Sequence, residues 1–225
     1  MVDIYLTKID FSLVEAYKNK IAEIMPYLDK SGIQRRKDSK DAIRSIFGEA
    51  MVRMIVARKR GILPGEISFS RTYYGKPYIE GSNIQFNVSH SGEYVVCGIS
   101  TKPIGVDIEE IKNQDIACIA KRFFSKAELQ FLNEEGETLF LERFYELWVL
   151  RESYLKWLGL GLTKPLDSFS ICITDENITV NDKNIKASPF FFRYSDSGYK
   201  IAVCSRCNEF PNQICKMSME EVLRF

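Results

Sequence analysis

The chain has 225 residues, of which 45% are hydrophobic and 12% aromatic, and its formal net charge is +1. This length and composition suffice for one large domain or two small ones and exclude an intrinsically disordered protein. No apolar run approaches the roughly 20 residues that span a bilayer, the N-terminus does not resemble a signal segment, and the six cysteines have irregular spacing. We therefore expect a cytoplasmic protein with reduced thiols.

The small net charge conceals an uneven distribution. Residues 1–104 carry a net charge of +5, whereas residues 105–225 carry −4. This asymmetry favours an anionic partner for the first half of the chain and a cation for the second.

In chain order, the first half predicts two helices and five strands from its apolar spacing and turn residues. The longer helix keeps near-helical apolar spacing and ends at Gly61, after three basic residues that suit the negative end of a helix dipole. The expected elements are strand 3–11, helix 13–28, helix 41–60, a strand–turn–strand unit in 67–81, and strands 84–90 and 93–100.

The second half predicts four strands and four helices, two of which begin with capping-box spacing at Ser125 and Ser218. The expected elements are strands 104–111, 168–174, 177–181 and 198–205, and helices 115–123, 125–135, 141–159 and 218–223.

Each half therefore combines one long helix with several strands, which predicts an α+β fold of two similar lobes. The expected lobes are residues 1–103 and 104–225. Short turns join the strands at 84–90, 93–100 and 104–111, and this arrangement predicts a three-stranded β-meander.

Two acidic side chains interrupt the strand "IGVDIEEI", residues 104–111. Because side chains alternate along a strand, the aliphatic residues point to one face, and Asp107 and Glu109 point to the other. Like charges so close together repel each other. Either this face is open to water, or a cation lies between the two carboxylates.

The predicted helix 141–159 places Trp148, Glu152 and Lys156 on one stripe, at i, i+4 and i+8. Glu152 and Lys156 could be an ordinary surface ion pair. The neighbouring aromatic side chain instead favours an inward-facing stripe, where buried charges need partners. With Asp107 and Glu109, Glu152 would complete three hard oxygen donors of the kind that Mg²⁺ prefers.

The single histidine, His90, lies at the end of the strand "FNVSHSG". It is either a structural residue or a donor to a phosphate; a nucleophilic pair with Ser89 is disfavoured because adjacent strand residues point to opposite faces. The "CSRC" segment, Cys204 to Cys207, has metal-site spacing but lacks two further ligands, so packing is the preferred interpretation.

Six segments, taken together and in order, resemble the 4′-phosphopantetheinyl transferases of the larger, two-lobed type that activates peptide synthetases. These segments are "YYGKP", "FNVSHSG", "IGVDIEEI", "KRFFSKAEL", "WVLRESYLKWLGLGL" and "PLDSFSI". The most specific part of the pattern is "GVDIE" followed about 40 residues later by W-x-x-x-E-x-x-x-K.

The resemblance implies transfer of 4′-phosphopantetheine from coenzyme A to a serine of an apo acyl, peptidyl or aryl carrier protein, with release of adenosine 3′,5′-bisphosphate. It implies two lobes in pseudo-twofold relation with coenzyme A between them. It also implies a monomer that needs neither nucleic acid nor membrane.

The resemblance further assigns the site residues. The implied metal ligands are Asp107, Glu109 and Glu152, holding Mg²⁺ or alternatively Mn²⁺. Physical reasoning about the reaction adds the expected catalytic residues: Glu152 as the base for the serine proton, and Lys156 and His90 to neutralise the pyrophosphate charge. The implied coenzyme A contacts are Lys30, Arg44, Lys76, Ser89, His90 and Lys156. Glu128 matches an acidic residue near the metal.

Two other functions use the same residues. A metal-dependent phosphohydrolase would employ these carboxylates with water as the nucleophile, and a non-catalytic module would bind coenzyme A or a carrier protein without transfer.

Overall fold

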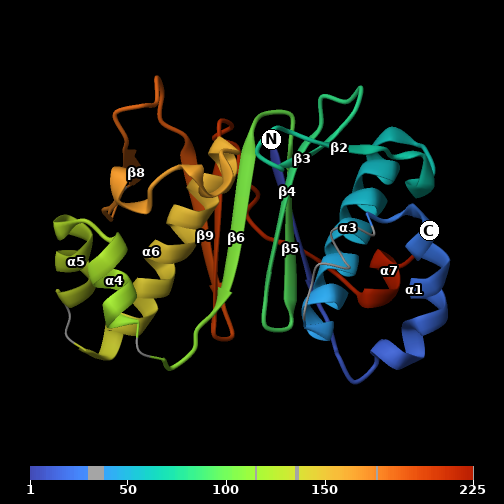
Figure 1. The fold of residues 1–225 in the computed structure, drawn as a ribbon, viewed down its shortest axis with the longest axis horizontal. Coiled ribbons are helices and arrows are strands. Elements are labelled where there is room, and N and C mark those ends of the chain that lie inside the picture. Colours follow the sequence, from blue (N-terminus) through green and yellow to red (C-terminus); the bar gives the residue numbers. More distant parts are fainter. Residues whose placement is uncertain (30–37, 115, 135–136, 176, 225) are drawn as a thin grey trace.

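The computed structural model describes residues 1–29, 38–114, 116–134, 137–175 and 177–224. Two β-sheets lie in the middle of the molecule, and the long helices α3 and α6 flank them on opposite sides (Figure 1). Each sheet with its long helix forms one lobe. This arrangement confirms the predicted α+β class.

The first sheet is built from both ends of the chain. Its order is β11 (Cys215–Met217), β1 (Val2–Lys8), β5 (Tyr94–Ser100) and β4 (Gln85–Ser91), antiparallel except for the parallel pair β1 and β11. Helix α3 (Ser39–Arg60) packs on it. The Asp38 side chain caps its N-terminus by accepting from the Lys40 amide, and Gly61 ends it with a left-handed φ of 65°.

The second sheet has three antiparallel strands in the order β6 (Ile104–Glu110), β10 (Tyr199–Ser205) and β9 (Phe190–Asp196). Helix α6 (Glu137–Leu158) packs on it and begins four residues before the predicted start. Strand β9 was not predicted, because the three consecutive phenylalanines of "FFFRYSD" obscure the short apolar–polar alternation that follows them.

The predicted three-stranded meander is wrong at its last strand. Strands β4 and β5 pair as expected, but β6 pairs with β10 instead of β5. Nearly all of β6 is buried on both faces, so its partner is chosen by packing and not by the short turn that precedes it. Consequently the chain leaves the first sheet after residue 100 and starts the second.

Three apolar clusters fill the layers between these elements. One lies between α3 and the first sheet, and one between α6 and the second sheet. The third joins the two sheets and includes Ile4, Val96, Val106 and Val203. Because strand side chains alternate, the β6 aliphatics enter this middle cluster while Asp107 faces the other way, as predicted.

The remaining elements are short. Both predicted capping boxes form, at Ser125 with Glu128 and at Ser218 with Glu221. The helix expected at 13–28 is split into a short α-helix, α1 (Lys18–Ile24), with one 3₁₀ turn before it and another after it. The elements are α1 (Lys18–Ile24), α4 (Ala117–Phe123), α5 (Lys126–Asn133), α7 (Met219–Val222), hairpin β2 (Phe69–Arg71) with β3 (Pro77–Ile79), hairpin β7 (Ser170–Ile173) with β8 (Ile178–Asn181), and 3₁₀ turns Val14–Tyr17, Met25–Tyr27, Pro64–Glu66, Gly161–Thr163 and Leu166–Ser168.

The chain returns to the first lobe at its C-terminal end, where β11 pairs with β1 and α7 packs near α3. The predicted lobe boundary between residues 103 and 104 stays a prediction. Strand β11 and helix α7, however, belong to the second predicted segment and pack in the first lobe. None of the helices in the described part of the chain is long and apolar enough to cross a membrane.

Candidate active site

The edge strands β4 and β6 lie side by side between the lobes (Figure 1). Side chains of β4 join the two strands. The Val106 amide donates to Asn87 Oδ1 at 2.8 Å, and the Glu110 amide donates to Ser91 Oγ at 3.1 Å. The polar face of β4 therefore binds the backbone of β6. This register places Ser89, midway between those two contacts, opposite Asp107.

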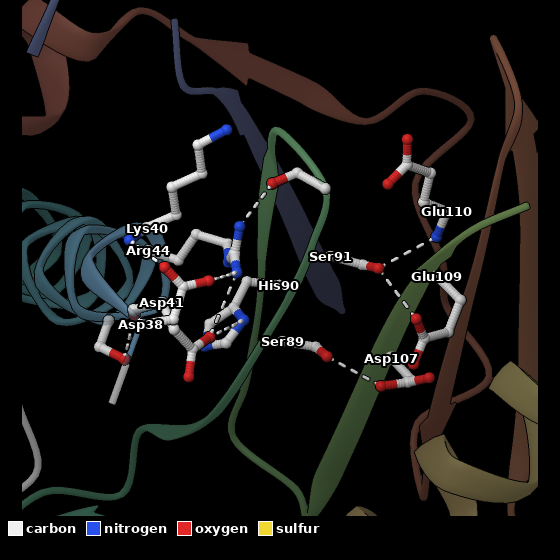
Figure 2. A network of polar contacts seen from close by, with 12 residues as sticks. Asp38, Lys40, Asp41, Arg44, Ser89, His90, Ser91, Asp107, Glu109 and Glu110 are labelled. Atoms are coloured by element: carbon white, nitrogen blue, oxygen red, sulfur yellow. Dashed lines mark hydrogen bonds and ion pairs between the residues drawn. The ribbon is translucent and has the colours of Figure 1, made fainter. Parts of the chain in front are cut away.

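Asp107 is the centre of the site and is 3% exposed. Its Oδ1 accepts from Ser89 Oγ at 2.8 Å and from Lys156 Nζ at 2.7 Å, and the same ammonium lies 2.7 Å from Ser89 Oγ. Its Oδ2 is also buried and has no hydrogen-bond partner among the described residues. Figure 2 shows Ser89 and Asp107 pointing toward each other across the strands. The carboxylate therefore has one satisfied and one unsatisfied oxygen.

Helix α6 brings Glu152 and Lys156 to β6 because Gly105 lets the two backbones touch. A Cβ at Gly105 would lie 2.1 Å from the Ser153 carbonyl oxygen and 2.2 Å from the Trp157 nitrogen. No side chain larger than hydrogen fits there without moving the helix. The predicted inward stripe on this helix is thus explained by a glycine on the facing strand.

Glu109 lies two residues beyond Asp107, where Ser91 Oγ donates to its Oε2 at 2.9 Å (Figure 2). Burial and the Asp107 charge raise the pKa of Glu109 to about 7, although the Ser91 hydrogen bond and Lys156 oppose the shift. Burial and Asp107 also raise the pKa of Glu152, against Lys156 and Arg151. At both half-buried carboxylates, burial and the Asp107 charge therefore outweigh the opposing charge of Lys156.

These residues fit a hard divalent cation in donor chemistry. Asp107 Oδ2 is buried without a partner, and the raised pKa values of Glu109 and Glu152 would be reversed by a nearby positive charge. Within the described ranges, no three His, Cys, Asp or Glu side chains are already arranged as a metal cage. The Lys156 ammonium instead supplies the positive charge next to Asp107.

His90 points away from Ser89, toward α3, as the strand alternation predicts (Figure 2). Its Nδ1 lies 3.7 Å from Asp41 Oδ1. Arg44, also on α3, donates from Nη1 to the Gly92 carbonyl at 2.9 Å and lies 3.5 Å from Asp41. These two predicted site residues therefore lie together on the α3 side of β4. Lys30 lies outside the described residues.

Lys76 occupies a different position from that expected of a phosphate ligand. Its Nζ donates to the Ile104 carbonyl at 2.8 Å and to the Lys156 carbonyl at 2.6 Å. Burial lowers the pKa of Lys76 to about 8. The turn between β2 and β3 thus brings the Lys76 ammonium to the backbone of the second lobe.

A pocket of about 690 Å³ opens between α3, the β2–β3 hairpin and β4, with His90 in its wall. Its charged lining was not predicted. Arg53 donates to the Ile67 carbonyl at 2.6 Å and pairs with Glu49, while Arg71 pairs with Asp29 at 2.6 Å. The i, i+4 spacing of Glu49 and Arg53 was the available sequence signal.

A second pocket, of about 250 Å³, adjoins Glu109 on the side of α6. Phe144, Tyr145 and Trp148 line it together with Ser91 and Glu109. Trp148 therefore lies beside the carboxylates with its ring stacked on Phe144, and the expectation of an inward aromatic on this stripe holds.

Glu128 does not belong to this carboxylate group, contrary to the expectation from the resemblance. It is 1% exposed, and its oxygens accept from the amides of Ser125 at 2.7 Å and Ile171 at 2.9 Å. It also pairs with Arg151, which donates to the carbonyls of Phe123 and Leu166. The pair is a buried structural connection behind α6.

All six cysteines carry free thiols, and Cys204 is fully buried. Cys207, the second cysteine of the C-x-x-C segment, is half-buried and donates its backbone amide to Ser205 Oγ.

Two models of known protein families match this chain. Residues 103–204 match the family model described as the 4′-phosphopantetheinyl transferase superfamily, and residues 15–102 match the 4′-phosphopantetheinyl transferase N-terminal model. The chain belongs to the 4′-phosphopantetheinyl transferase superfamily. It is therefore a transferase, and the family resemblance in the sequence is confirmed.

Several curated relatives of the family match nearly the whole chain. A 4′-phosphopantetheinyl transferase of Bacillus subtilis is 40% identical over 81% of this chain and 83% of its own. The transferase ffp of Bacillus subtilis is 34% identical over 98% and 99%, and gsp of Aneurinibacillus migulanus is 32% identical over 99% and 94%. A solved Helicobacter pylori holo-[acyl-carrier-protein] synthase in complex with coenzyme A covers 45% of this chain and 96% of its own, at 20% identity and a TM-score of 0.37.

Proposed function

We propose that this transferase moves 4′-phosphopantetheine from coenzyme A to a serine of an apo carrier protein in a reaction that depends on Mg²⁺. The observation that carries the proposal is the Ser89–Asp107–Lys156 cluster between the lobes, with its unsatisfied carboxylate oxygen. The family membership supports it.

Coenzyme A is the substrate that suits the first lobe. The pocket beside His90 is large enough for a nucleotide, and Arg53 and Arg71, each paired with an acid, are among its lining residues. His90 and Arg44 lie on its side of β4, and Lys156 lies across β4 from them. A pyrophosphate bound near the end of β4 would have cationic groups from both lobes beside it, which would lower the cost of its charge.

Asp107, Glu109 and Glu152 would hold the cation. When bound, Mg²⁺ neutralises pyrophosphate charge that would otherwise repel an incoming nucleophile. Mn²⁺ offers the same ligand preferences. Lys156, which contacts Asp107 and Ser89, would donate to a phosphate oxygen, where its ammonium would stabilise the leaving group.

Glu152 is the proposed general base. Burial and the Asp107 charge raise its pKa, and a bound cation would reverse that shift and keep the carboxylate ionised, ready to accept a proton. The carrier serine hydroxyl gives its proton to Glu152 as its oxygen bonds to the phosphorus on the pantetheine side of the pyrophosphate. The bond from that phosphorus to the bridging oxygen breaks, and adenosine 3′,5′-bisphosphate leaves with the bond electrons.

The partner is an apo acyl, peptidyl or aryl carrier protein of fatty-acid, polyketide or nonribosomal peptide synthesis. A cytoplasmic monomer that works without nucleic acid or membrane belongs to the same proposal, since each chain contains both lobes. Light scattering of the purified chain with and without carrier protein measures this stoichiometry.

Intact-mass analysis of apo carrier protein tests the reaction. Incubation with the chain, coenzyme A and Mg²⁺ should add one phosphopantetheine per carrier and release an equal amount of adenosine 3′,5′-bisphosphate, and a chelator should abolish both. Release of the nucleotide without any mass gain would indicate hydrolysis. Binding of coenzyme A with no product on several carriers would contradict transfer.

A further inference from the structure

The last turn of α6 crosses the start of β6 at an unusually short distance. The backbone atoms of Ser153 and Trp157 contact Gly105 so closely that a methyl group would overlap both. This crossing fixes where the Lys156 side chain leaves the helix. Any movement of the turn would therefore move the ammonium that meets Ser89 and Asp107.

Lys76 closes this crossing from the other lobe. The Lys156 carbonyl is one of the last four of α6, which lack partners within a helix and lie at the negative end of its dipole. The Lys76 ammonium donates to this carbonyl at 2.6 Å and to the Ile104 carbonyl, next to Gly105, at 2.8 Å. One cation thus binds the helix end and the strand start simultaneously.

The surroundings of Lys76 suit this role. Gly159, with a φ of 69°, turns the chain beside the lysine stem, and a Cβ there would lie 3.1 Å from Lys76 Cδ. The titratable group that acts on the ammonium is Cys204 of β10. Burial raises the pKa of Cys204 well above its ordinary value, so the thiol is neutral and does not compete for the ammonium.

We propose that Lys76 is a positioning residue that holds the last turn of α6 on β6 and thereby sets the Lys156 ammonium against Ser89 and Asp107. The proposal rests on the transfer reaction for its kinetic consequence. It differs from the role of a coenzyme A contact, because the Lys76 ammonium acts on Lys156 and not on substrate.

Lys76→Met tests the proposal, and Lys102→Met, at an exposed turn of the same lobe, is the matched control. Without ligand, Lys76→Met should increase amide hydrogen exchange in the last turn of α6, residues 155–159, and Lys102→Met should not. In transfer assays, kcat should fall about tenfold to a hundredfold with KM for coenzyme A changed less than about threefold. Lys76→Arg, which keeps the charge, should restore part of the exchange protection.

The exchange measurement is independent of activity. Unchanged exchange in Lys76→Met, or a rise in KM with kcat preserved, would overturn the positioning role. If Lys76→Met increases exchange but the wild type transfers no phosphopantetheine, the positioning role of Lys76 stands and the proposed function is rejected.

If Lys76→Met does not fold, Gly105→Ala examines the same crossing from the strand. Its matched control is Gly98→Ala, where the added Cβ meets the end of the Ile104 side chain at 2.8 Å and Val106 Cβ at an ordinary 3.7 Å, and no backbone atom of α6. Gly105→Ala should increase exchange at residues 155–159 and lower kcat, and Gly98→Ala should do neither. Equal behaviour of the two variants would overturn the proposal.

Discussion

Helix α6 contacts buried carboxylates on two sides, and the two sets differ in how completely they are paired. Toward the interior of the second lobe, Glu128 has Arg151 and two backbone amides, and Asp182 has Lys164, Tyr154 and the Asn184 amide. Toward the first lobe, Asp107 keeps one buried oxygen without a partner among the described residues. Burial alone therefore does not distinguish structural from functional carboxylates.

The pKa directions follow the same division. Burial raises the pKa of Asp182, but hydrogen bonds from Lys164 and Tyr154 outweigh it and hold the value below the ordinary one. Burial and the charge of Asp107 raise the pKa values of Glu109 and Glu152 instead. A buried acid with complete partners contributes to stability, whereas one without them indicates a site that a ligand completes.

The largest expected effect is on activity. Asp107→Ala removes the acid at the centre of the site, and transfer to the carrier protein should fall at least about 10²–10³-fold. The free energy of unfolding should change by less than about 1 kcal/mol, because the substitution also removes an unsatisfied buried oxygen. Initial rates by intact mass and urea denaturation measure the two effects. If Asp107→Ala instead lost much of its stability and kept its activity, Asp107 would be a structural carboxylate and not a functional one.

Glu128→Ala should show the opposite pattern. It leaves Arg151 as a buried charge without its acid, which lowers the free energy of unfolding by about 3–5 kcal/mol. Activity per folded molecule should remain within about threefold of wild type. Urea denaturation measures the first effect, and Glu23→Ala, at an exposed helix position, is the control. Loss of turnover from folded Glu128→Ala would place this residue in the active site after all.

The raised pKa of Glu109, about 7 against an ordinary 4.5, predicts a pH dependence of stability without metal. Between pH 4.5 and about 7, Glu109 is protonated in the folded state and ionised in the unfolded state. The free energy of unfolding should therefore fall as pH rises through this window, by at most on the order of 3 kcal/mol. Urea denaturation from pH 4 to 8 measures the slope.

Glu109→Gln is the control for this slope, since it cannot titrate and should remove the contribution. Adding Mg²⁺ at pH 8 should raise the melting temperature of the wild type, because the cation binds the ionised carboxylates. An identical slope in wild type and Glu109→Gln would refute the assignment.

Ser91→Ala should produce the smallest effect. Ser91 donates to Glu109 and accepts from the Glu110 amide, so its loss should destabilise the chain by about 1 kcal/mol. Because the Ser91 hydrogen bond lowers the pKa of Glu109, that pKa should rise further. The midpoint of the pH–stability curve reports the shift, and Ser91→Thr should keep it near wild type.

Local sequence patterns were sufficient for both long helices, for most strands and for the orientation of Asp107 and Glu109. They could not predict the partner of β6, since pairing with β10 joins segments about 95 residues apart. The contacts of Lys76 are backbone carbonyls, which no side-chain pattern encodes. Glu128 matched the family pattern, yet its neighbours in space give it a structural role.

Counting bound Mn²⁺ by electron paramagnetic resonance, in the presence of coenzyme A, tests the central claim most directly. The wild type and Glu128→Ala should each bind one Mn²⁺ per folded chain, and Asp107→Ala should bind none. Equal binding by Asp107→Ala, or no binding by the wild type, would show that the incompletely paired carboxylates are not a cation site.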